Sequence, residues 1–256
     1  MAVGAARGLP EIRAGPATSV SVRAMSSLPR ALLLDLDGTL VDSEMVHVAG
    51  LRRLCADRGV VLTQAEGLYV IGHGWREIFR ELDLAARLGL DLAAVIAGTV
   101  AAKDLLFGEG LELSVLPGAR ELLALAREAA IPTAIVTGSA RLELGQALRA
   151  LGVGPEQLAA SVCAEDVPRG KPSPDGFLKA AALLGVAPAS CLVVEDSEAG
   201  IAAGIAAGMR VLAVAAGNQP AGAPGHQDQS AAHHQRASLA GLRREDLAAM
   251  MMGPEI

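Results

Sequence analysis

The stretch Ala31-Leu32-Leu33-Leu34-Asp35-Leu36-Asp37-Gly38-Thr39 decides the fold, because an apolar run ends abruptly in two acids and a glycine. A continuous apolar run of this kind is typical of a parallel strand that is covered on both faces of its sheet. In open α/β sheets, ligands bind at the carboxyl ends of the strands. The stretch therefore predicts a first strand that delivers Asp35 and Asp37 to a binding site.

The sequence before and after Pro117 follows two different patterns. Residues 44–110 carry apolar side chains at three- and four-residue spacings without a strand-like run, which predicts a helical insert. From Pro117 onward helical and strand-like patterns alternate, which favours a mostly parallel sheet covered by helices. The expected helices are 119–129, 141–151, 175–184 and 199–207, and the expected strands are 131–137, 161–164, 191–194 and 210–214.

These patterns predict an α/β fold, with a Rossmann-like, doubly wound parallel sheet as the core and an inserted all-α cap domain. A chain of 256 residues has room for one such core and one smaller insert. We expect the core to comprise residues 31–43 and 112–217, and the cap to comprise residues 44–111. Residues 218–256 are expected to form a loop and a C-terminal helix.

Both ends of the chain differ from this core. Residues 1–30 hold four arginines and a single acid, which is typical of a transit peptide; a disordered extension without an address, or a start at Met25, would also explain it. We therefore expect a soluble protein of the chloroplast or the mitochondrion, or otherwise of the cytoplasm. Near the other end, a mobile loop is predicted over 218–235 and a helix over 238–251 with Ser238 as its N-cap.

The composition argues against a nucleic-acid or membrane partner. The net charge is −6 and aromatic residues make up 2%, so the chain has neither a general positive field nor many rings for stacking on bases. Arg210 interrupts the most apolar late stretch, 201–216, so a bilayer span is not expected. The three cysteines are scattered outside metal-ligand spacing, which fits buried thiols in a reducing compartment. We expect a small-molecule partner, and a monomer or weak dimer.

Asp35 and Asp37 are two residues apart at the end of the predicted strand, so both can reach one edge as the chain turns at Gly38. Two carboxylates this close are unfavourable as anions unless a cation or a shared proton compensates them. The simplest arrangement is a divalent metal bound by one carboxylate, with the other free to move protons. An Asp-rich turn that caps the following helix is the structural alternative.

Four segments of the chain, in order, resemble the four sequence motifs of the haloacid dehalogenase superfamily. They are Asp35-Leu36-Asp37-Gly38-Thr39 with its continuation Leu40-Val41-Asp42-Ser43-Glu44, then Val136-Thr137-Gly138-Ser139, then Gly170-Lys171-Pro172-Ser173-Pro174-Asp175, and then Val194-Glu195-Asp196-Ser197-Glu198-Ala199-Gly200-Ile201. The resemblance covers residues 31–217. It implies a phosphohydrolase whose substrate is a small phosphate monoester.

The resemblance also implies a role for individual residues. Asp35 is the nucleophile that becomes transiently phosphorylated, while Asp37 first protonates the leaving alcohol and then deprotonates the attacking water. Thr137 hydrogen-bonds the phosphoryl oxygens, with Gly138 beside it as a further substrate contact, and Lys171 supplies fixed positive charge. Dehalogenases and phosphonate hydrolases of this fold depart from the second acid of the first motif, so Asp37 favours phosphoryl chemistry.

A magnesium ion is the cofactor that the resemblance implies. Its ligands are the side chains of Asp35 and Asp196 and the backbone carbonyl of Asp37, with Glu195 bound directly or through water. Each residue taken alone also fits an ordinary loop or helix-terminal position, since acids are favoured at helix N-termini. The four strand ends of a parallel sheet converge on one place, which favours the catalytic interpretation.

The helical insert directly after the first motif resembles the cap of the beta-phosphoglucomutase-like and phosphoglycolate-phosphatase-like branch. In that branch the segment Gly72-His73-Gly74-Trp75-Arg76 corresponds to the substrate-reading loop, which makes Trp75 and Arg76 candidate substrate contacts. Lys103 is a further candidate for a second anionic group. His47 is also a candidate substrate contact, and the resemblance to the mutase implies that it accompanies Asp37 in the hinge region. Alternatively, Trp75 belongs to the cap core and the two cations are solvated.

The leading hypothesis is a magnesium-dependent phosphatase of small phosphorylated metabolites, most of all sugar or polyol phosphates, that acts through an aspartyl phosphate. The alternatives are a beta-phosphoglucomutase-like phosphomutase and a non-catalytic binding protein on the same fold. Arg76 lies one position later than the cap arginine of the mutase, which counts against the mutase. The intact acids and lysine of the four motifs count against a protein without activity.

Overall fold

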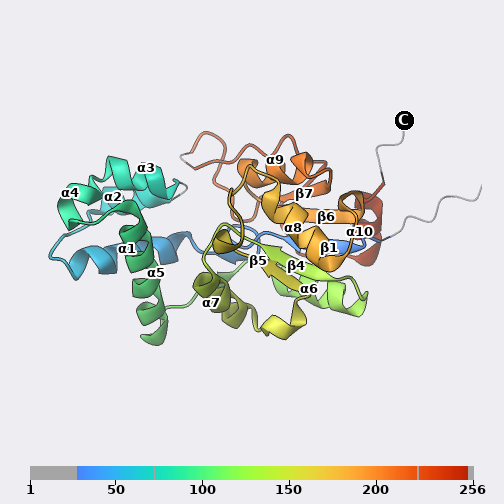
Figure 1. Cartoon of the computed structure of the whole chain (residues 1–256), viewed down its shortest axis with the longest axis horizontal. Coiled ribbons are helices and arrows are strands. Elements are labelled where there is room, and N and C mark those ends of the chain that lie inside the picture. Colours follow the sequence, from blue (N-terminus) through green and yellow to red (C-terminus); the bar gives the residue numbers. More distant parts are fainter. Residues whose placement is uncertain (1–27, 72, 224, 253–256) are drawn as a thin grey trace, which may run out of the picture.

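The computed structural model describes residues 28–71, 73–223 and 225–252. Its centre is a parallel sheet with the strand order β5-β4-β1-β6-β7-β8 (Figure 1). The strands are β1 (Ala31–Leu34), β4 (Thr133–Val136), β5 (Ala160–Val162), β6 (Cys191–Glu195), β7 (Arg210–Val214) and β8 (His234–Arg236). Because β1 lies between β4 and β6, the residues that follow it lie at the middle of the carboxyl edge.

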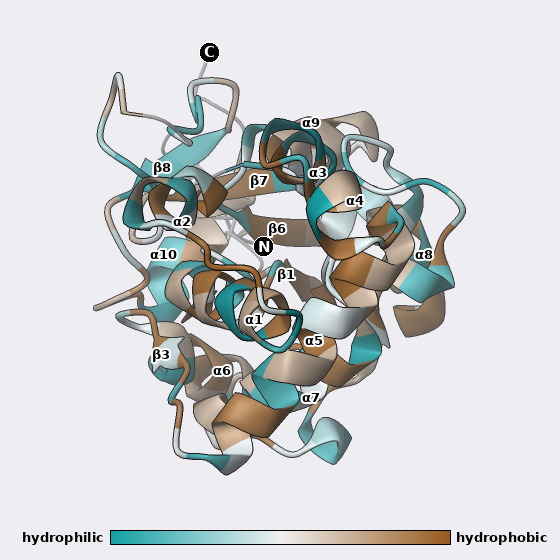
Figure 2. Ribbon diagram, turned by 90° about the vertical axis from the view of Figure 1, so that its left-hand side faces the viewer, coloured by the Kyte–Doolittle hydropathy of each residue, from teal (hydrophilic) through white to brown (hydrophobic). Residues whose placement is uncertain are grey.

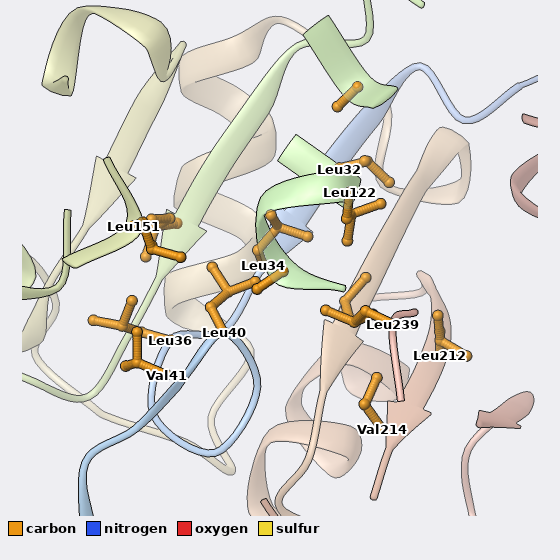
Figure 3. Close-up of a cluster of buried hydrophobic side chains, with 14 of the residues drawn as sticks. Leu32, Leu34, Leu36, Leu40, Val41, Leu122, Leu151, Leu212, Val214 and Leu239 are labelled. Carbon is orange, nitrogen blue, oxygen red and sulfur yellow. The ribbon is translucent and has the colours of Figure 1, made fainter. Parts of the chain in front are cut away.

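Helices cover both faces of this sheet, as the fold prediction requires (Figure 1). They are α6 (Ala119–Glu128), α7 (Arg141–Leu151) and α10 (Arg244–Met250) on one face, and α8 (Asp175–Leu184) and α9 (Glu198–Ala206) on the other. Leu32 and Leu34 pack in the cluster under α6, α7 and α10 (Figure 3), whereas Ala31 and Leu33 pack under α8 and α9. Successive strand residues point to opposite faces, so a strand covered on both sides must be apolar throughout.

Five further helices form a group of their own beyond the carboxyl end of β1 (Figures 1 and 2). They are α1 (Glu44–Ala56), α2 (Gln64–Val70), α3 (Trp75–Glu81), α4 (Leu84–Leu88) and α5 (Leu92–Gly108). Their apolar side chains, among them Leu51, Leu84 and Val95, form a cluster separate from those of the sheet. A short antiparallel pair, β2 (Val41–Asp42) with β3 (Ser114–Val115), joins the two connections to the core. The helical group therefore faces the edge that carries Asp35.

The C-terminal part differs from its prediction in two respects. The expected loop over 218–235 ends in a strand, β8, which extends the sheet beside β7. The last helix begins at Arg244 rather than after Ser238, whose Oγ instead accepts a hydrogen bond from the backbone N–H of Ala240 at 3.3 Å in a turn. The turn arises because Leu239 is buried in the core, which bends the chain before the helix begins.

Other expectations concern the chain ends, the membrane and the cysteines. Residues 1–27, which hold most of the expected transit peptide, lie outside the described residues. No helix in the described ranges is both long and apolar enough to cross a bilayer. The cysteines Cys55, Cys163 and Cys191 are buried and free, as expected.

Candidate active site

A cavity of about 380 Å³ lies where the carboxyl ends of the strands face the helical cap. Its walls include Asp35, Asp37, Thr137, Gly138, Lys171 and Asp196 from the sheet side, and His47 and Trp75 from the cap. Asp35 follows β1, Thr137 follows β4, and Asp196 follows β6. Segments far apart in the sequence meet here because parallel strands all end at the same edge.

Lys171 is fixed between two carboxylates. Its Nζ donates to Asp35 Oδ1 and, at 2.5 Å, to Glu195 Oε1. Glu195 is fully buried, and its Oε2 accepts from the backbone N–H groups of Asp196 and Ser197, both at 2.8 Å, and from the Ser197 hydroxyl. Burial opposes the charge of Lys171, but the two carboxylates prevail and raise its pKa above the ordinary value. The ammonium group is therefore held in its charged form.

Three carboxylates gather around this single ammonium group. Asp35, Glu195 and Asp196 each offer an oxygen, and these oxygens all lie within 4.8 Å of one another. Burial raises the pKa of Asp35 to about 7 against the opposing effect of Lys171, and burial together with Asp35 raises the pKa of Asp196 well above its ordinary value. Such shifts mark negative charge that lacks compensation. A hard divalent cation such as Mg²⁺ prefers oxygen ligands and would supply that compensation, so the residues fit this group.

Gly38 allows the first motif to turn tightly against Asp196. Its φ is +82°, and a Cβ atom at this position would lie 2.1 Å from Asp196 Oδ2. The next residue, Thr39, donates from Oγ1 to Asp196 Oδ1 at 3.1 Å. A side chain at position 38 would therefore displace the carboxylate that lies beside Asp35.

In the presence of a chelator, we expect the change in melting temperature caused by Asp35→Asn to be more favourable at pH 8 than at pH 5. The folded state holds the pKa of Asp35 at about 7, above the ordinary 3.8, so folding binds this proton more tightly and the contribution of Asp35 to stability falls as pH rises through this window. Asparagine does not ionise and avoids this loss. Thermal unfolding of the variant and of the unaltered protein at both pH values measures the effect, and a change in melting temperature that is the same at both would contradict it.

Asp37 is held as a carboxylate by hydroxyl groups of the second motif. Its Oδ2 accepts from Ser139 Oγ at 2.6 Å and from Thr137 Oγ1 at 3.3 Å. Although burial opposes the charge, His47, Ser139 and Ser43 lower the pKa of Asp37. The sequence assigned no role to Ser139, although its position in the second motif is the signal that could have predicted this contact.

Lys103 does not face the cavity, which corrects its assignment as a candidate substrate contact. The residue is 2% exposed, and its Nζ forms an ion pair with Glu143 of α7 and lies 3.0 Å from Nδ1 of His47. Burial and the positive charge of Lys103 lower the pKa of His47, against the opposing effect of Asp37 and Glu143. The cation therefore joins the cap helix α5 to the core helix α7 instead of binding substrate.

Glu143→Gln should lower the free energy of unfolding by about 3 kcal/mol, because the Lys103 ammonium would be left buried without its counter-charge. For a chain of this size that corresponds to a melting temperature lower by roughly 6–12 °C. Glu121→Gln is the matched control, since Glu121 occupies the first turn of α6 as Glu143 does that of α7 but is exposed. Equal melting temperatures of the two variants would show that the ion pair is not stabilising.

Of the two candidate substrate contacts in the predicted substrate-reading loop, Trp75 and Arg76, only the first lines the cavity. Trp75 begins α3 and lines the cavity, and its ring meets that of His47 edge-on with centroids 6.1 Å apart. Arg76 is exposed and is absent from the described residues that line the cavity. The neighbouring His73 lines the cavity and stacks on Tyr69 with ring centroids 4.1 Å apart. The cap thus presents rings rather than a guanidinium group to the cavity.

One part of the cavity wall was not predicted. This part of the wall follows β7 and consists of Gly217, Asn218, Gln219 and Gln227. Three of these residues lie in the loop over 218–235, for which the sequence suggested no role. Their only sequence signal is a set of amide side chains that comes after a strand of the sheet.

Comparison with known proteins gives consistent results. Residues 29–208 match the family model described as haloacid dehalogenase-like hydrolase. Hexitol phosphatase A of Escherichia coli (strain K12) is 36% identical over 76% of this chain and 86% of its own length, and the validoxylamine A 7'-phosphate phosphatase of Streptomyces hygroscopicus subsp. limoneus is 31% identical over 70% and 83%. The crystal structure of CbbY from Rhodobacter sphaeroides in complex with phosphate superimposes with a TM-score of 0.69 at 25% identity, covering 84% of this chain and 96% of that one.

Proposed function

Since this chain belongs to the haloacid dehalogenase-like hydrolase family, we propose that it is a magnesium-dependent phosphatase of sugar or polyol monophosphates that acts through a phosphorylated Asp35. The family and its named relatives make the chain a phosphatase of small phosphorylated molecules. The residues that line the site support the metal, the substrate class and the residue roles.

The cluster of Asp35, Lys171 and Asp196 carries the proposal. A phosphate ester is an anion that a carboxylate repels, so Asp35 can attack phosphorus only where positive charge gathers the phosphoryl oxygens. Lys171 already contacts Asp35 and is held in its charged form. A bound Mg²⁺ would supply the remaining positive charge. The side chains of Asp35 and Asp196 and the backbone carbonyl of Asp37 would hold it.

Glu195 has a different part in this proposal. Its Oε1 binds Lys171 and its Oε2 already accepts three hydrogen bonds, so both oxygens are engaged. We assign to it the positioning of the lysine and of the backbone at Asp196, with any bond to the metal secondary. Gly200 packs closely here, since a Cβ on it would lie 1.7 Å from Glu195 Oε1.

Asp37 moves the protons in both steps. As a carboxylate held by Ser139, it can accept a proton from the water that cleaves the phosphorylated Asp35. In the first step it must hold a proton in order to give it to the leaving alcohol. The negative charge of a bound phosphate ester raises the pKa of Asp37 and so favours its protonated form. Thr137 and Gly138 line the same wall and contact the phosphoryl oxygens in this proposal.

The test is release of inorganic phosphate by the full chain from sugar, polyol, glycolate and nucleotide monophosphates, each with Mg²⁺ and with a chelator. We expect release from the sugar or polyol esters that the chelator suppresses. Phosphate release that persists in the chelator would contradict the magnesium dependence. No phosphate release from any of the esters would contradict the phosphatase function.

The phosphomutase alternative receives less support from the cavity. A mutase must hold a bisphosphate, and so two phosphoryl groups, within one site. Lys171 is the only Lys or Arg side chain among the described residues that line the cavity. In the release assay a mutase would retain the phosphoryl group within the sugar pool instead of producing inorganic phosphate.

A further inference from the structure

The chain between β7 and β8 forms a third wall of the cavity, beside the sheet edge and the cap. We call residues 217–223 and 225–229 the rim segment. Gly217, Asn218, Gln219, Gly225 and Gln227 of this segment line the cavity together with Asp35 and Lys171. In Figure 1 the segment extends from the sheet toward α3.

The rim segment is built into the core at its first end. Gly217 approaches the first motif so closely that a Cβ on it would lie 2.5 Å from the carbonyl oxygen of Gly38. At the other end, Gln229 is buried and donates from Nε2 to the backbone carbonyls of Asp196 and Val214, at 2.7 and 2.9 Å. The segment is thus fixed on the same residues that hold the catalytic cluster.

Asn218 and Gln227 close the rim segment on itself. Asn218 donates from Nδ2 to the carbonyl of Gln227 and accepts from the N–H of Gln227 at Oδ1, both at 2.9 Å. The side chain of Gln227 accepts from the backbone N–H of Glu198 at 3.1 Å and donates to the carbonyl of Gly225. Both amide groups are therefore engaged by hydrogen bonds within the loop and to the first residue of α9, so they have a positioning role.

Gln219 is the exception among these amides. Its backbone carbonyl lies 2.8 Å from Nδ1 of His226, which holds the main chain in place. Its side-chain amide, half-buried in the cavity wall, makes no hydrogen bond in the part of the chain that the structure describes. An amide offers both donors and an acceptor, which suits a hydroxyl group.

The charges of the cavity specify what this amide can recognise. The single cation that lines it among the described residues, Lys171, is engaged by Asp35 and Glu195 at the phosphoryl position. A second anionic group on the substrate would find no further Lys or Arg side chain among the described residues that line the cavity, and it would lose its hydration there. A carbon chain that carries hydroxyl groups would find Gln219, and Trp75 would offer an apolar surface to its C–H groups.

We propose that Gln219 is a specificity-determining residue that hydrogen-bonds a hydroxyl group on the carbon chain of a neutral polyol or sugar monophosphate. This inference rests on the proposed phosphatase function. Asn218 and Gln227 hold the rim segment so that Gln219 faces the substrate chain rather than solvent.

The experiment measures kcat/KM for sorbitol 6-phosphate, for phenyl phosphate, which has no hydroxyl groups on its carbon skeleton, and for 3-phosphoglycerate, which carries a second anionic group. Gln219→Ala should lower the ratio of sorbitol 6-phosphate to phenyl phosphate about 10-fold, the effect of one lost hydrogen bond to a substrate hydroxyl. Gln219→Lys should raise the ratio of 3-phosphoglycerate to sorbitol 6-phosphate. Gln64→Ala is the control, since Gln64 is an exposed glutamine of α2 outside the cavity wall.

If Gln219→Ala leaves the ratio of sorbitol 6-phosphate to phenyl phosphate within twofold of the control, the role of Gln219 is overturned. Turnover of phenyl phosphate by the unaltered protein would in that case still support the phosphatase function. No phosphate release from either ester by the unaltered protein would overturn the proposed function and the inference together. An increase in the ratio of 3-phosphoglycerate to sorbitol 6-phosphate in Gln219→Lys supports the inference. An unchanged ratio in this variant counts against it.

Discussion

Asp35→Asn is expected to lower kcat by at least about 10⁴-fold, which is of the order seen when a catalytic nucleophile is removed. The amide has nearly the same shape as the carboxylate but cannot attack phosphorus or carry the phosphoryl group. Asp35 is 6% exposed and contacts Lys171, so the substitution removes one partner of a buried pair without changing the packing. Phosphate release with saturating Mg²⁺ and substrate measures the effect.

Asp57→Asn is the matched control for Asp35→Asn. Asp57 is an exposed acid at the end of α1 that binds Arg53 on the surface, so its loss should leave kcat within twofold. Circular dichroism of both variants verifies that they fold. A folded Asp35→Asn protein that keeps a tenth or more of the unaltered kcat would show that the attacking group lies elsewhere.

Lys171→Met should lower kcat by about 10³-fold, because it removes the only Lys or Arg side chain among the described residues that line the cavity. Methionine has a similar length and fills the same space without a charge. The variant would also leave Asp35 and Glu195 without their shared partner, so at neutral pH we expect metal-free protein to melt at a lower temperature. The measurements are kcat with saturating Mg²⁺ and thermal unfolding in a chelator.

Lys179→Met provides the comparison for the lysine substitution. Lys179 lies on α8, the helix that follows the Lys171 loop, and its exposed Nζ donates to the carbonyl of Asp166 at 2.6 Å. Its loss should affect neither kcat nor the melting temperature by much. If both lysine variants lose activity equally, the positive charge at position 171 has no special part in the reaction.

The fold could be predicted from the sequence because its signals are local. The apolar run of β1 reports a strand buried on both faces, and helices 141–151 and 175–184 have the predicted bounds. The acids and the lysine of the motifs were assigned to one site because the carboxyl ends of parallel strands share an edge. The structure places Asp35, Asp37, Thr137, Lys171 and Asp196 around one cavity at that edge.

The differences arise where a contact partner lies far away in the sequence. From the sequence, Lys103 is indistinguishable from a surface lysine. Its partner Glu143 is 40 residues away on another helix, and only the fold brings the two together. The strand β8 is short and polar, and only its pairing with β7 makes it a strand. Gln219 belongs to a glycine- and proline-rich loop, whose composition predicts a turn but not which side chain will face the cavity.

The measurement that tests the central claim most directly is chemical trapping of the phosphorylated enzyme. Protein turning over sorbitol 6-phosphate with Mg²⁺ is acid-quenched and treated with borohydride, which converts an aspartyl phosphate into homoserine, and is then digested with trypsin. Fragmentation of the peptide that runs from Ala31 to Arg52, which contains Asp35, Asp37 and Asp42, locates the change. The proposed mechanism predicts homoserine at position 35, and only with substrate present. Homoserine at Asp37, or none during steady phosphate release, would contradict it.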